Sequence, residues 1–183
     1  MARIFYSMAG EGRGHATRVR TVTDHLRERH ELTLLAPGDA YELLEKAYRA
    51  SDVRVQRIPG LRFAYDRKQK VSQLGTAALV ARYALALPQI DRELAELMRH
   101  HRADLLLTDY DPGGPRAAKR AGVPYVALDH QSFFNFSDLS WLPKKLQHRG
   151  AFVARINRFL YHGQRHTISS SFDPIRSRAW RTA

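Results

Sequence analysis

Residues 3–18 read RIFYSMAGEGRGHATR, and this stretch indicates the fold. Residues 3–8 have the composition of a strand, residues 9–14 form a glycine-rich turn, and apolar side chains then recur at helical spacing as far as Leu26. A strand that leads through a glycine-rich loop into a helix is typical of sheets whose strands are joined by helical crossovers. The sequence therefore predicts a β-loop-α unit at the start of an α/β domain.

The same alternation continues along the chain. Strands are expected over residues 31–36, 53–58, 103–109, 123–128 and 166–169, and helices from Asp39 through Tyr48, over residues 71–101 and over residues 115–121. Pro88 is expected to bend the longest helical region or to divide it in two. Because parallel strands need helical crossovers, we predict a Rossmann-like, doubly wound and mainly parallel sheet. Residues 1–172 form one domain in this prediction, and residues 173–183 form an irregular tail.

Composition narrows the class of protein. The 183 residues suffice for one well-packed domain but not for two α/β domains of ordinary size. Cysteine is absent, which excludes disulfides and thiolate metal sites. We find neither a secretory signal nor a run of roughly 20 apolar residues, so a cytoplasmic location is expected. The formal net charge of +12 favours polyanionic partners without distinguishing nucleic acid, anionic lipid and phosphorylated small molecules.

The glycine-rich loop is the first candidate site. Gly10, Gly12 and Gly14 let the backbone approach a ligand closely, and the helix that follows offers free N–H groups, with Arg13 beside them. His15 would lie at the rim of this pocket, where an imidazole can take a proton from an attacking hydroxyl. The glycine spacing matches neither the dinucleotide fingerprint nor the P-loop. A tight structural turn is the alternative interpretation.

Two further polar clusters follow predicted strands. Asp109 and Asp111 come at the end of one strand, and Asp129, His130 and Gln131 follow the next. The carboxyl ends of parallel strands share one edge of a sheet, so these side chains are expected near His15. Either Asp109 or Asp111 could orient the imidazole or bind an acceptor hydroxyl, and either could instead be a turn or helix-cap residue. No third ligand is spaced for a metal site at Asp129 and His130, so none is predicted.

Residues 4–6 and 10–18 resemble the N-terminal region of GT-B glycosyltransferases related to UDP-glucuronosyltransferases, monogalactosyldiacylglycerol synthase and the enzyme that makes lipid II. Similar segments in bacterial and archaeal glycosyltransferases of this kind correspond to residues 107–112, 122–124, 129–131 and 168–172. The resemblance extends from Ala2 to Phe172. It is specific for the type of enzyme and not for the substrate.

The resemblance implies that the chain is the acceptor-binding half of a hexosyltransferase and that His15 is the base for the acceptor hydroxyl, on a sugar or a lipid-linked acceptor. It implies no metal or other cofactor, because a second domain holds the nucleotide-sugar donor in this family. The sequence departs from the family pattern at Asp173 and stops at Ala183, so the donor domain is expected to be missing and the chain inactive alone. A fragment, a half that pairs with a separate donor chain, and a pseudoenzyme all fit this interpretation.

Residues 141–166 are basic and contain no acidic side chain. They predict either an amphipathic helix that packs on the sheet or an interfacial helix on the inner face of an anionic membrane. The neighbouring aromatic residues are expected in the core or at a domain interface; they are Phe133, Phe134, Phe136 and Trp141.

Two other functions were weighed against glycosyl transfer. A Rossmann-like nucleotide or dinucleotide-binding module would use Asp39 to hold a ribose. A nucleic-acid-binding module is suggested only by the net charge, because no reading motif is visible. The leading hypothesis from the sequence is therefore the acceptor half of a nucleotide-sugar-dependent glycosyltransferase, without nucleic acid as a partner.

Overall fold

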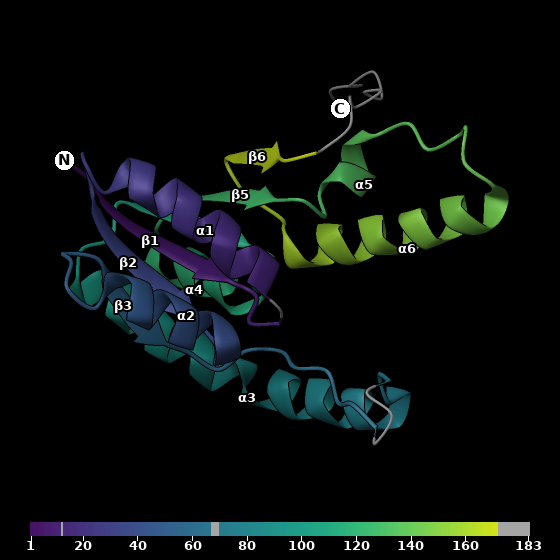
Figure 1. The fold of residues 1–183 in the computed structure, drawn as a ribbon, viewed down its shortest axis with the longest axis horizontal. Helices are drawn as coiled ribbons and strands as arrows, with labels where there is room; N and C mark the ends of the chain where they lie inside the picture. The colour runs from purple at the N-terminus through teal and green to yellow at the C-terminus, as the bar shows by residue number, and fades with distance from the viewer. Residues whose placement is uncertain (12, 67–69, 172–183) are drawn as a thin grey trace.

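The computed structural model describes residues 1–11, 13–66 and 70–171 (Figure 1). Gly12 of the glycine-rich loop and the expected tail over residues 173–183 lie outside the described residues. Within the described residues the chain forms one parallel sheet with helices, which confirms the predicted Rossmann-like α/β fold.

The sheet has six strands in the order β3-β2-β1-β4-β5-β6. The strands are β1 (Arg3–Met8), β2 (Glu31–Ala36), β3 (Arg54–Arg57), β4 (Leu105–Asp109), β5 (Tyr125–Asp129) and β6 (His166–Ser169). Every neighbouring pair in this order is parallel. The chain moves outward from β1 to β3, returns to pair β4 with β1, and then continues to the other edge. The strand order therefore reverses between β1 and β4, and ligands of such sheets bind beside this reversal.

Helices cover both faces of the sheet (Figure 1). They are α1 (Arg13–Leu26), α2 (Gly38–Tyr48), α3 (Gln73–His100), α4 (Gly113–Ala121), α5 (Phe133–Phe136) and α6 (Lys144–Leu160). Alternate side chains of β1 point to opposite faces: Phe5 joins the core beneath α3 and α4, whereas Ile4 and Tyr6 join the core beneath α1 and α2. These two apolar layers hold the strands in register.

Pro88 lies inside α3, which runs as one helix from Gln73 to His100. The sequence left open whether Pro88 bends this region or divides it into two helices. In the structure it is not divided. Burial explains why the helix continues: Ile90, Leu94 and Met98 are buried in the core after the proline and fix that half against the sheet. The half before the proline is mostly exposed, apart from Tyr83, and extends past the end of the sheet (Figure 1).

The basic segment forms α6, which packs against α5 and extends away from the sheet (Figure 1). Its buried residues include Ala154 and Asn157, whereas Phe152 and Phe159 are exposed. Trp141, which precedes the helix, is 65% exposed rather than part of a core. In the described part of the chain, no helix combines the length and the hydropathy that a bilayer-spanning segment needs.

Asp111 lies in the connection from β4 to α4 and is buried beside the start of that helix. Its carboxylate accepts hydrogen bonds from the backbone N–H groups of Gly114, at 2.7 Å, and Gly113, at 3.4 Å. Burial raises the pKa of this carboxyl to about 6, although these hydrogen bonds favour the ionised form. Gly114 also packs on Ser7 of β1, because a Cβ added there would contact the Ser7 side chain and lie 2.9 Å from an Asp111 oxygen.

Gly114→Ala is expected to destabilise the domain by about 1–3 kcal/mol, because the added methyl group overpacks the contact between α4 and β1. Gly14→Ala is the matched control and should leave stability nearly unchanged, since the space around Gly14, at the start of α1, is open. Urea unfolding measures both effects. Equal stabilities of the two variants would contradict this account of the α4 contact.

Asp111→Asn is expected to flatten the dependence of stability on pH. The pKa of Asp111 is raised from 3.8 to about 6 in the folded protein, so its contribution to stability is fully present below pH 4 and is lost as the pH rises through 6. The stability of the wild type relative to Asp111→Asn should therefore fall by about 2–2.5 kcal/mol between pH 4 and pH 7. Urea unfolding across this range measures the change, and the exposed Asp52→Asn variant should follow the wild type.

Candidate functional site

The candidate site lies where the strand order reverses, at the carboxyl ends of β1 and β4. Met8 and Asp109 are paired at the last positions of these two strands. The Ala9 N–H donates to the Asp109 carbonyl oxygen at 2.9 Å, so the glycine-rich loop leaves the sheet directly beside Asp109. α1 then begins at Arg13, which brings its first turn above the end of β4.

His15, Asp109 and Arg18 form a hydrogen-bonded group at this point. The His15 Nδ1 atom lies 2.9 Å from Asp109 Oδ1, although the residues are 94 positions apart in the sequence. Arg18 follows His15 by one turn of α1, and its guanidinium donates from Nε to Oδ2 and from a terminal nitrogen to Oδ1, both at 2.8 Å. The Asp109 side chain has no exposed surface, so both of its oxygens depend on these partners.

The hydrogen bond to Asp109 indicates which imidazole nitrogen carries the proton. An ionised carboxylate only accepts hydrogen bonds, so Nδ1 of His15 donates to Asp109. The neutral ring then has a lone pair on Nε2, which has no partner among the described residues. The Tyr110 ring stacks on the imidazole, with centroids 6.4 Å apart and planes at 11°. These contacts fix the ring and leave its basic nitrogen available.

The charges around Asp109 are balanced by Arg18. Burial would lower the pKa of the Arg18 guanidinium, but its hydrogen bonds with Asp109 and the charge of that carboxylate raise it. Tyr6, beneath this group, is fully buried, and burial followed by the charge of Asp109 raises the pKa of its phenol. The site is therefore a paired carboxylate and guanidinium set into an apolar sheet, with the histidine at its outer side.

The other predicted site residues have different surroundings. Asp111 contacts the start of α4, so the structure pairs Asp109 and not Asp111 with His15. Asp129 is buried and accepts from the backbone and side chain of Ser132, and burial raises the pKa of Asp129. The His130 ring lies 2.6 Å from the Ser170 carbonyl oxygen, and the Gln131 carbonyl oxygen accepts from Asn157. This third cluster thus connects β5 with β6 and α6.

The loop residues also separate into two groups. Gly10 lies against Pro37, since a Cβ there would be 2.8 Å from the Pro37 carbonyl oxygen. Gly14 faces open space, whereas Arg13 lines a cavity between α1 and α2. Among the described residues, no group of three or more histidine, aspartate or glutamate side chains is placed to hold a metal ion.

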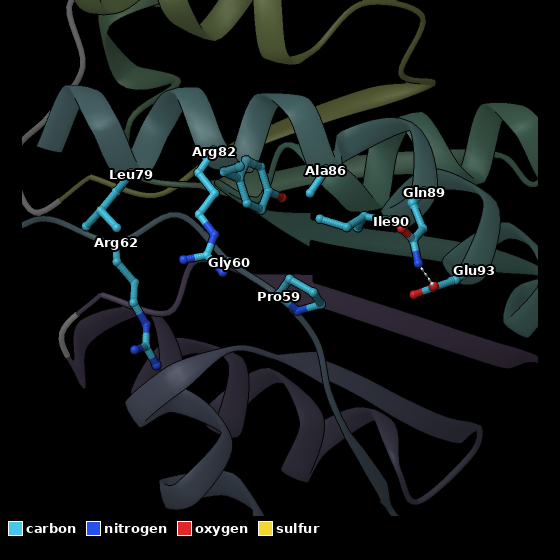
Figure 2. Close-up of a pocket in the computed structure, with 10 residues that line it drawn as sticks. Pro59, Gly60, Arg62, Leu79, Arg82, Ala86, Gln89, Ile90 and Glu93 are labelled. Carbon is cyan, nitrogen blue, oxygen red and sulfur yellow. Dashed lines mark hydrogen bonds between the residues drawn. The ribbon is translucent and has the colours of Figure 1, made fainter.

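A cavity of about 380 Å³ lies between α3 and the loop that follows β3 (Figure 2). The loop wall contributes Pro59, Gly60 and Arg62. Gly60 lets this loop approach Pro37 closely, and the Phe63 N–H donates to Glu11 of the glycine-rich loop at 2.7 Å. The cavity therefore adjoins the loop from which α1 and His15 begin.

Sequence reasoning missed two parts of this arrangement. Arg18 was visible three residues after His15, the spacing that places two side chains on one face of a helix, but its partner Asp109 is remote in the sequence. No local sequence pattern indicates the cavity beside α3, because its two walls come from separate segments of the chain. Only the path of the chain after β3 brings them together.

Several solved structures have a similar fold, and SsfS6 is among those described as glycosyltransferases. SsfS6 from Streptomyces sp. SF2575, complexed with thymidine diphosphate, has a TM-score of 0.54 and 18% identity over 93% of this chain and 49% of that chain. MurG from Acinetobacter baumannii has a TM-score of 0.51 and 14% identity over 85% of this chain and 40% of that chain. Phytolacca americana UGT2, complexed with UDP-2fluoro-glucose and pterostilbene, has a TM-score of 0.51 and 21% identity over 80% of this chain and 35% of that chain.

The chain therefore spans between 35% and 49% of the length of these three proteins. At such identities the likeness shows the fold alone, which is that of one half of a two-domain GT-B protein. Among proteins with curated descriptions, none matches the sequence significantly. The model of the family described as "Glycosyl transferase family 1" matches residues 2–182. This match covers nearly the whole chain, and the chain belongs to glycosyl transferase family 1.

Proposed function

We propose that this chain is the acceptor-binding half of a nucleotide-sugar-dependent hexosyltransferase and that His15 is its general base. The observation that carries the proposal is the hydrogen bond between His15 Nδ1 and the buried Asp109, which leaves Nε2 as a proton acceptor at the carboxyl edge of the sheet. Family membership supports the type of reaction. The cavity beside α3 offers space for an acceptor next to the glycine-rich loop.

The reaction follows from this geometry. Nε2 of His15 accepts the proton of the acceptor hydroxyl as the hydroxyl oxygen forms a bond to the anomeric carbon of the donor. The bond between that carbon and the diphosphate breaks, and the nucleoside diphosphate leaves with the electron pair. Asp109 stabilises the imidazolium that forms and keeps the ring oriented. Arg18 holds Asp109 in place through two hydrogen bonds and so acts as a positioning residue.

The nucleotide sugar is a co-substrate in this proposal, held mainly by a second domain in the same or a partner chain. Backbone at Gly10 and Gly14 would shape the cleft near the reacting hydroxyl. The competing function is dinucleotide binding with Asp39 on the ribose. The space between Gly10 and Asp39 is only about 40 Å³, but Asp39 also lines the cavity between α1 and α2. Family membership, and not lack of space, therefore favours glycosyl transfer.

We also propose that α6 contacts the inner face of an anionic membrane. Phe152 and Phe159 are exposed two turns apart on α6, with the exposed Arg155 between them on the same side. Apolar and cationic side chains on one helix face suit the boundary between headgroups and acyl chains. Such a contact would bring the domain to a lipid-linked acceptor.

His15→Gln is expected to lower the rate of transfer by a factor of about 10²–10⁴, because it removes the base without a large change in volume. The assay is the release of UDP or TDP from nucleotide sugars by the complete enzyme that contains this chain, with its donor domain or donor chain present. His25→Gln, an exposed substitution on the same helix, should retain full activity. Circular dichroism checks that both variants fold. Full turnover by His15→Gln would remove the histidine from the mechanism.

Replacing both Phe152 and Phe159 by serine is expected to reduce binding to phosphatidylglycerol vesicles by about tenfold or more, because it removes the apolar anchors of α6. Cosedimentation of the chain with vesicles measures the bound fraction. Phosphatidylcholine vesicles are the control for charge and should bind the wild type weakly. If the double variant binds anionic vesicles as the wild type does, α6 is not the contact.

A further inference from the structure

We infer that the cavity beside α3 accepts an amphipathic anion, in which an apolar body carries a carboxylate or phosphate group. This inference rests on the proposed function, because it names the chemical class of the acceptor. The cavity volume of about 380 Å³ is in the range of small-molecule sites. The ligand class follows from how apolar and charged side chains are distributed along its walls.

The middle of the cavity is apolar. On α3, Leu79, Ala86 and Ile90 recur at intervals of seven and four residues, so they lie on one face of the helix. Figure 2 shows this face opposite Pro59 of the loop after β3. The buried Tyr83 completes the wall between Leu79 and Ala86. A ring or a short chain of a ligand would lose its contact with water against these groups.

The two ends of the cavity differ in charge. Arg62 and Arg82 lie toward one end, and Glu93 lies at the other (Figure 2). The carboxylate at the far end already accepts a hydrogen bond from Gln89 at 2.8 Å. Across the described residues, neither guanidinium has an ion-pair partner. Among the described residues the cationic end therefore makes no ion pair, although Glu11 and Asp39 line the small space next to Arg62. Two guanidinium groups bind carboxylate or phosphate oxygens well.

Arg62 is held at the end that adjoins the glycine-rich loop. Its terminal nitrogen lies 3.4 Å from the position that a Cβ of Gly38 would occupy, so the guanidinium lies against a glycine with a positive φ of 51°. Arg62 also lines the small space beside Gly10 and Glu11. An anionic group bound by Arg62 and Arg82 would thus lie at the end of the cavity nearest the start of α1. A hydroxyl close to that group would be the one presented to His15.

The experiment measures binding of 1-naphthyl phosphate to the full chain by calorimetry, with NMR shifts to map the site. 1-Naphthol tests the apolar body without the charge, inorganic phosphate tests the charge alone, and 1-naphthoate compares carboxylate with phosphate. We expect naphthyl phosphate or naphthoate to bind at least about tenfold more tightly than either naphthol or phosphate. The shifts should centre on α3 between Leu79 and Ile90.

Variants of the chain locate the contacts. Arg62→Gln and Arg82→Gln should each lower the affinity for naphthyl phosphate by about tenfold and leave the affinity for naphthol nearly unchanged. Arg92→Gln removes the same charge from an exposed site on α3 that does not line the cavity, and it should have no effect. Leu79→Asn should lower the affinities for naphthol and for naphthyl phosphate by similar factors. The inference would be overturned if Arg92→Gln and Arg82→Gln lowered the affinity for naphthyl phosphate equally. It would also be overturned if naphthol and naphthyl phosphate bound with equal affinity.

His15→Gln separates this inference from the proposed function. The substitution should leave probe binding unchanged, because His15 does not line the cavity. Probe binding that depends on Arg62 and Arg82, together with transfer that survives His15→Gln, would retain the ligand class and reject the proposed mechanism. Loss of transfer in His15→Gln without any binding of the anionic probes would reject the ligand class alone.

Discussion

The buried carboxylate of Asp109 is the constraint on which this site depends. A carboxylate without exposed surface is stable only when its oxygens are hydrogen-bonded and its charge is compensated. Arg18 and His15 meet both needs, and both belong to the first turns of α1. The contacts of His15 and Arg18 with the Asp109 carboxylate therefore fix the start of α1 above the sheet. The glycine-rich loop has to connect β1 to a helix that is held in this position.

Much of the fold could be predicted from the sequence because each strand and helix has a local pattern. The strand at residues 31–36 and the helix over residues 115–121 have clear local patterns, and both are present. Pro88 was ambiguous for a physical reason. A proline weakens a helix locally, but the packing of Ile90 and Leu94 against the sheet decides whether the helix continues, and packing is not a local property.

The candidate site was less predictable than the fold. Asp109 and Asp111 are two residues apart after the same strand, and sequence spacing alone does not tell which one meets His15. The register of β4 against β1 makes the difference, since it places Asp109 opposite Met8 at the root of the glycine-rich loop. Asp111, beyond the strand end, instead meets the N–H groups of α4. The roles of both residues in catalysis stay predictions, and the expected contribution of Gly12 lies outside the described residues.

Within the continuous helix α3, Pro88 also marks the boundary between two levels of local stability. The half that follows the proline is anchored in the core, so its amide hydrogens exchange only when the domain opens widely. The half that precedes it is mostly exposed and can fray at a much smaller cost in free energy. On the α3 wall of the cavity, Leu79 and Ala86 belong to this exposed half, whereas Ile90 belongs to the anchored half. One end of the cavity can therefore change shape to fit a ligand while its other end, and the contact of His15 with Asp109, keep their geometry.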